Sequence, residues 1–146
     1  MSTIFIHPEG VAGAIAVAIA ASMTWQLREN PDWGRCFFDA GLRHTPESGV
    51  RRGVLLARTT PPEIPITDGA RVLGNGSLVT ASDTVPFCLW MVARNARPFV
   101  EAIGKTISAG GDCDTNAAIV GGIVALSAGR KSIPDEWLQA RETIHP

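Results

Sequence analysis

The stretch GGDCDTNAAIVGG, residues 110–122, sets the expectations for the whole chain. A glycine pair precedes two aspartates one residue apart, and a threonine and a run of small apolar residues follow. Such a run predicts a buried helix that packs closely against its neighbours. Carboxylates on alternate residues beside a hydroxyl are hard oxygen donors, which can converge on Mg²⁺ or Ca²⁺. The stretch is therefore typical of either a capped helix or the start of a metal site.

Two interpretations of Asp112, Asp114 and Thr115 stand side by side. In the first, Asp114 or Thr115 caps the helix and Asp112 is a turn residue, since short polar side chains accept the free N–H groups of a helix start. In the second, the three side chains are metal ligands at the positive end of the helix dipole. The chemistry alone favours neither. An EF-hand is excluded, because its sixth and twelfth positions would be Ala117 and Ile123 instead of glycine and glutamate.

The composition indicates one globular domain without a nucleic-acid-binding surface. The 146 residues are 45% hydrophobic and 18% charged, with a net charge of -1, and a chain of this length can bury a core. It has no block of Lys and Arg that nucleic acid would require. Cys36, Cys88 and Cys113 are far apart and odd in number, so we expect no disulfide framework and a reducing, cytoplasmic setting.

A second apolar run extends from Val11 to Met23 and contains one polar residue, Ser22. A helix that is apolar all round is buried all round, so we expect a central helix covered on every side. The run is shorter than the roughly twenty residues of a membrane span. No Lys or Arg precedes it, which argues against a signal peptide. We therefore expect no membrane association.

The rest of the pattern is helical, and no convincing strand is found. Further helices are expected over residues 30–40, from Pro46 to about Arg58, after a cap at Ser82 or Asp83 with Pro86 in the first turn, from Pro98 to Gly110, from the start near Asp114 or Thr115 to Leu126, and from Ser132. Residues 59–68, which contain three prolines, are expected to form an extended loop. The sequence thus predicts a single all-α domain over residues 1–146.

Three further features could contact a ligand. His7 precedes the apolar run, and it either caps that helix, which is its more ordinary role, or contacts a ligand. Gly74-Asn75-Gly76-Ser77 is a turn whose glycines let the backbone approach another group closely. It lacks the lysine of a P-loop, so it is weak evidence for phosphate binding. The Arg51-Arg52 pair could hold phosphates, although a solvated face is favoured.

The 110–122 stretch resembles the C-terminal signature of the ADP-ribosylglycohydrolases, which is Gly-Gly-Asp-x-Asp-Thr followed by a small-residue helix. The matching residues are Gly110, Gly111, Asp112, Asp114 and Thr115. Residues 7–14 resemble the family's histidine-containing helix start, and residues 74–86 resemble its glycine loop and following helix. Gly129 and residues 133–137 resemble its ending. These pieces occur in the family's order and cover nearly the whole chain.

The resemblance implies an all-α fold that binds two Mg²⁺ ions, or Mn²⁺ in their place. It implies hydrolysis of the N- or O-glycosidic bond that joins ADP-ribose to a modified protein or to a small molecule. By this resemblance Asp112, Asp114 and Thr115 are metal ligands, and His7 is a substrate contact near the ribose or the phosphates. Residues Gly74 to Ser77 line the adenosine side of the site.

The family also has an N-terminal half with a Thr-Asp-Asp-Thr motif for the remaining metal ligands, and usually an acidic residue that acts on the glycosidic bond. This sequence contains no Asp-Asp pair, and three donors leave much of a near-octahedral Mg²⁺ shell to water. We therefore expect the chain to correspond to the C-terminal half and to need a complementary N-terminal half for activity. Two alternatives remain. One is a non-catalytic module that binds ADP-ribose or metal, and the other is a structural fragment that covers its apolar helices by self-association.

Overall fold

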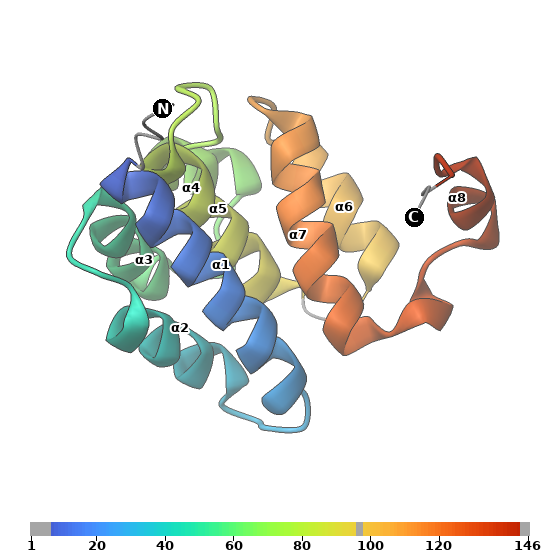
Figure 1. The fold of residues 1–146 in the computed structure, drawn as a ribbon, viewed down its shortest axis with the longest axis horizontal. Coiled ribbons are helices and arrows are strands. Elements are labelled where there is room, and N and C mark those ends of the chain that lie inside the picture. The colour runs from blue at the N-terminus through green and yellow to red at the C-terminus, as the bar shows by residue number, and fades with distance from the viewer. Residues whose placement is uncertain (1–6, 96–97, 144–146) are drawn as a thin grey trace, which may run out of the picture.

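The computed structural model describes residues 7–95 and 98–143, and this part of the chain consists of helices and connecting loops without a strand. Its elements are α1 (Pro8–Gln26), α2 (Trp33–His44), α3 (Gly49–Thr59), α4 (Ile66–Leu73), α5 (Ala81–Arg94), α6 (Phe99–Ser108), α7 (Cys113–Ala128), the 3₁₀ turn η1 (Arg130–Ser132) and α8 (Asp135–Ala140). The predicted all-α fold is confirmed. Figure 1 shows α1 between the α2–α3 pair and the α6–α7 pair, with α8 set apart near the C-terminus.

Helix α5 forms the centre of the core, and its residues 84–92 are all buried. Helix α3 packs along it. The approach is close because Gly53 faces Pro86, and a Cβ at Gly53 would lie 2.3 Å from the proline ring. The sequence predicts Pro86 in the first turn of this helix, and that prediction is wrong. Pro86 lies further inside because α5 begins earlier, at Ala81.

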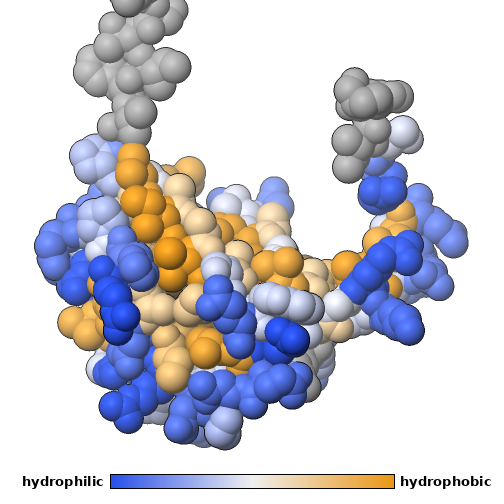
Figure 2. Space-filling model, turned by 60° about the horizontal axis from the view of Figure 1, so that its bottom comes forward, coloured by the Kyte–Doolittle hydropathy of each residue, from blue (hydrophilic) through white to orange (hydrophobic). Residues whose placement is uncertain are grey.

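Helix α1 is buried along one stripe, so the expectation that it is covered on every side is wrong. The buried positions recur with the helical period and are Ala12, Gly13, Ala16, Ala20 and Thr24. Elsewhere on the helix Val11 is 39% exposed and Trp25 is 55% exposed. On the face of the molecule shown in Figure 2, an apolar area lies over this helix. An apolar helix carries no sequence signal for the face that neighbours cover, so packing against α2, α5 and α7 decides it.

Helix α1 is also long and apolar enough to cross a membrane by length and composition, and no other helix within residues 7–95 and 98–143 is. It is longer than the apolar run from which the sequence expectation was drawn, because it includes residues on both sides of that run. Core helices of soluble proteins meet the same criterion, so this is weak evidence for a membrane span.

Helix α4 lies partly in the segment for which the sequence predicts an extended loop. The three prolines lie before the helix, which begins at Ile66 directly after Pro65. Its Ala70 and Leu73 are buried. Gly69 lets α4 rest on Trp90, since a Cβ at that position would come within 2.3 Å of the indole ring.

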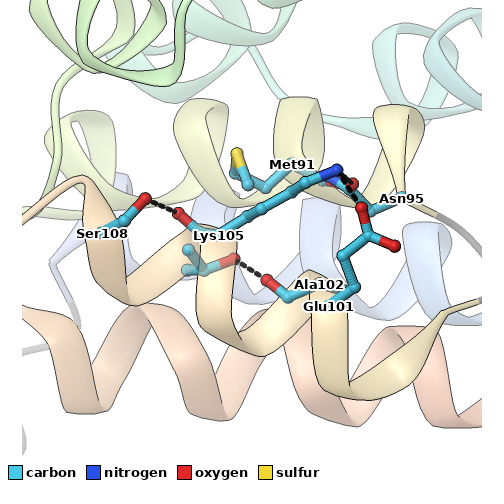
Figure 3. A network of polar contacts seen from close by, with 7 residues as sticks. Met91, Asn95, Glu101, Ala102, Lys105 and Ser108 are labelled. Atoms are coloured by element: carbon cyan, nitrogen blue, oxygen red, sulfur yellow. Dashed lines mark hydrogen bonds and ion pairs between the residues drawn. The ribbon is translucent and has the colours of Figure 1, made fainter.

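A polar network links α6 to the end of α5 (Figure 3). The buried Asn95 donates from Nδ2 to the carbonyl of Met91 at 3.0 Å, and its Oδ1 accepts from Lys105 Nζ at 3.2 Å. Lys105 also pairs with Glu101. Because α6 packs along α7 in turn, this network helps to hold the helix that carries the predicted metal ligands.

Candidate metal centre

The start of α7 carries the three predicted metal ligands. The helix begins at Cys113, slightly earlier than predicted, and Asp112 is its N-cap. The Asp112 Oδ1 accepts the backbone N–H of Thr115 at 3.2 Å, so Asp112 is the capping residue and not only a turn residue. Asp114 and Thr115 are exposed in the first turn. All three side chains lie at the positive end of the helix dipole.

Asp112 and Thr115 line a groove of about 610 Å³ that runs between α1, α7 and the start of α5. Its walls are mainly apolar and include Ala14 on α1 and Ile119 on α7. Asp114 is exposed and is not part of the groove lining. A groove with polar groups at one end and apolar walls suits a ligand that has both kinds of surface.

The glycine loop between α4 and α5 lies directly against the start of α7. The carbonyl oxygen of Asn75 accepts the backbone N–H of Asp112 at 3.1 Å and Nδ2 of Asn116 at 2.7 Å. A Cβ on Gly76 would lie 2.7 Å from Cβ of Asp112. A Cβ on Gly111 would lie 2.2 Å from the Asn75 carbonyl oxygen. Two motifs that are distant in the sequence thus meet, and Figure 1 shows them at the same end of the molecule.

The polar side chains of this loop form hydrogen bonds within the loop and to the segment that follows α6. Asn75 Oδ1 accepts from Ser77 Oγ at 2.6 Å, and Asn75 Nδ2 donates to the carbonyl of Ala109 at 3.4 Å. The residues of this segment that line the groove are Val79 and Thr80, which the sequence pattern does not single out. Val79 has a φ of 54°, a strained left-handed conformation for a β-branched residue. The predicted contact of the loop with substrate stays a prediction.

The start of α1 lies at this end of the molecule as well (Figure 1). His7 is exposed and caps α1, its Nδ1 accepting the backbone N–H of Glu9 at 3.3 Å. The capping role of His7 is thus confirmed, and its contact with a ligand stays a prediction. The Glu9 carboxylate accepts the N–H groups of Gly49 at 2.7 Å and Val50 at 3.0 Å. These bonds hold the pKa of Glu9 below its usual value and fix α1 to α3 beside Gly10, which lines the groove.

The arginine pair on α3 has a local structural explanation. Arg51 Nη1 lies 2.9 Å from Glu47 Oε1, and its Nε donates to the carbonyl of Leu42 at 3.1 Å. Arg52 is exposed. These contacts agree with the solvated face that the sequence favours.

The donor chemistry fits Mg²⁺ but does not complete its coordination. Asp112, Asp114 and Thr115 offer two carboxylates and a hydroxyl, which are hard oxygen ligands. In the part of the chain that the structure describes, no three His, Cys, Asp or Glu side chains are grouped so that they could hold a metal ion. Cys88 is buried and does not line the groove, and burial raises the pKa of its thiol to about 12. These residues can supply part of a hydrated Mg²⁺ site.

The fold and the site define a class of protein: a helical protein with hard oxygen donors at a helix start beside an apolar groove. The family model for ADP-ribosylglycohydrolase matches residues 4–145. The chain therefore belongs to the ADP-ribosylglycohydrolase family, and the resemblance seen in its motifs is confirmed. Comparisons with curated proteins and with solved structures gave no match.

Proposed function

We propose that this chain contributes to the Mg²⁺-dependent hydrolysis of the glycosidic bond in ADP-ribosylated substrates. The observation that carries this proposal is the hydrogen bond between Asn75 and Asp112, which joins the glycine loop to the start of α7 beside the groove. Family membership supplies the reaction class. The substrate class is a protein or a small molecule that carries an ADP-ribosyl group.

In this proposal Asp112, Asp114 and Thr115 are oxygen ligands of Mg²⁺, or of Mn²⁺ in its place. A bound ion would supply an activated water and would neutralise developing charge. The groove beside Asp112 receives the ADP-ribosyl group, and the N-terminal ends of α1 and α7 favour its phosphates. His7 contacts the ribose or phosphates, while residues Gly74 to Ser77 lie toward the adenosine.

Catalysis in this proposal requires donors beyond the three at the start of α7. Mg²⁺ prefers about six oxygen ligands, and a two-ion site needs further carboxylates. We infer that a complementary helical segment, whether part of a longer polypeptide or a separate chain, provides them and packs on the exposed face of α1. Ala14 and Ala18 are exposed there and also line the groove that Asp112 borders, so a segment on this face would reach the site. Self-association is the competing arrangement, but a second copy would bring the same donors only.

Hydrolysis assays with the purified full chain test this proposal. With Mg²⁺ and an ADP-ribosylated peptide, we expect no turnover by the chain alone. Addition of the N-terminal half of an intact family member, with its Thr-Asp-Asp-Thr motif, should give turnover that EDTA abolishes. The same mixture with Asp112→Asn in this chain is the inactive control.

Each outcome of the assay has a separate meaning. Turnover by the chain alone would refute the need for a complementary segment. A mixture that forms a complex on sedimentation but has no activity would refute the catalytic proposal. Calorimetry with ADP-ribose, with and without Mg²⁺, would then decide whether the chain is a binding module.

A further inference from the structure

Asn116 is a fully buried polar residue on the first turn of α7, next to the predicted ligand Thr115. A buried amide needs hydrogen-bond partners at both of its ends. Nδ2 of Asn116 donates to the carbonyl of Asn75 at 2.7 Å, and its Oδ1 accepts from Cys88 Sγ at 3.4 Å. Because a carbonyl can only accept and the buried thiol donates, the orientation of the amide is fixed.

The carbonyl of Asn75 connects Asn116 to Asp112. The backbone N–H of Asp112 donates to this same oxygen at 3.1 Å, and the carbonyl of Asp112 accepts the backbone N–H of Asn116 at 2.9 Å. The two residues therefore contact one carbonyl from the two ends of a single helical turn. A shift of the Asp112 backbone would lengthen at least one of these bonds.

We propose that Asn116 is a positioning residue for the cation site. By holding the Asn75 carbonyl against the start of α7, it fixes the backbone of Asp112 and so the carboxylate that the proposed function assigns to the ion. The inference rests on that proposed function. Groups that orient metal ligands commonly control metal affinity, and their loss typically weakens it about 10–100-fold.

Mn²⁺ binding to the full chain, followed by the electron paramagnetic resonance signal of free Mn²⁺, tests this role without catalysis. Asn116→Ala should weaken Mn²⁺ binding about 10–100-fold. Cys88→Ser keeps a donor for the Asn116 amide and should bind Mn²⁺ as the wild type does. Thr106→Val is the matched control, because Thr106 is also a fully buried polar residue whose hydroxyl bonds within its own helix, to the carbonyl of Ala102. It should lose stability and keep its Mn²⁺ affinity.

The outcomes separate the two proposals. A wild-type chain that binds no Mn²⁺ alone, and adds none to the N-terminal half of an intact family member, overturns the proposed function and the positioning role with it. Binding that Asp112→Asn abolishes and Asn116→Ala leaves unchanged overturns the positioning role alone. If circular dichroism shows that Asn116→Ala does not fold, Asn116→Ser takes its place with the same expectation, because its hydroxyl is too short to reach the Asn75 carbonyl.

Discussion

The Glu9 carboxylate accepts the backbone N–H of Gly49 at 2.7 Å, so a side chain at the start of α1 caps α3. This bond and the bond from Val50 favour the charged carboxylate and lower its pKa. A pKa that is lower in the folded than in the unfolded state stabilises the fold at pH values above the unfolded pKa. That stabilisation is lost as the pH falls through the folded pKa.

Glu9→Gln should therefore lower the melting temperature at neutral pH, because it removes the charge and nearly keeps the shape. The difference between wild type and variant should shrink as the pH falls below 4.5, the ordinary pKa of this group. Thermal unfolding followed by circular dichroism between about pH 3 and pH 7 measures it. Glu47→Gln is the control, since the Glu47 side chain is 80% exposed and its pair with Arg51 is a surface ion pair of little stability. A difference that stays constant down to the lowest pH would contradict the role of the charge.

Substitutions of Asp112 separate its capping role from metal binding. Asparagine caps helices about as well as aspartate, whereas loss of the cap to alanine costs about 1 kcal/mol. Asp112→Asn should therefore be more stable than Asp112→Ala in urea unfolding. Both variants should lose Mn²⁺ binding, because both lack the carboxylate. Mn²⁺ affinity that survives in Asp112→Asn would leave this residue with the capping role alone.

Gly76→Ala tests the close approach of the glycine loop to α7, with Gly110→Ala as its control. Both glycines have positive φ, 84° and 68°, so alanine at either position takes a left-handed conformation that costs about 1–2 kcal/mol. A Cβ at Gly76 would also meet Asp112 Cβ at 2.7 Å, while one at Gly110 would meet nothing within 4 Å. Urea unfolding should show the larger loss for Gly76→Ala, and the same variant should weaken Mn²⁺ binding. Equal losses of stability would mean that the loop yields without cost.

Local sequence patterns predicted much of the helical fold and the start of a helix near residues 112–115. Val50, Val54 and Ala57 recur at helical spacing, and all three are buried in α3, which lies within the helix predicted from Pro46 to about Arg58. Asp112 and Asp114 could be selected as candidate metal ligands from their spacing and from the predicted helix that follows them. Such patterns are local, so they can be recognised without knowledge of the tertiary structure.

The contacts that build the site were not predictable in this way. The Asn75 carbonyl accepts hydrogen bonds from Asp112 and Asn116, and no local sequence pattern connects it to either residue. Asn116 looks like one polar residue in a small-residue helix until its partners on α5 and on the glycine loop are seen. The left-handed φ of Val79 opposes the preference of its residue type. Each of these features depends on how the helices pack.

The exposed face of α1 gives a prediction about two alanines that the sequence does not distinguish. Ala16 is fully buried, whereas Ala18 is exposed and lines the groove. Ala16→Glu places an unpaired charge in the core and should cost about 3–5 kcal/mol or prevent folding. Ala18→Glu should change the free energy of unfolding by less than about 0.5 kcal/mol. It should nevertheless abolish binding of the complementary segment that we propose for this face, measured by sedimentation of the mixture. Equal damage by both substitutions in urea unfolding would mean that α1 is covered on both faces in solution.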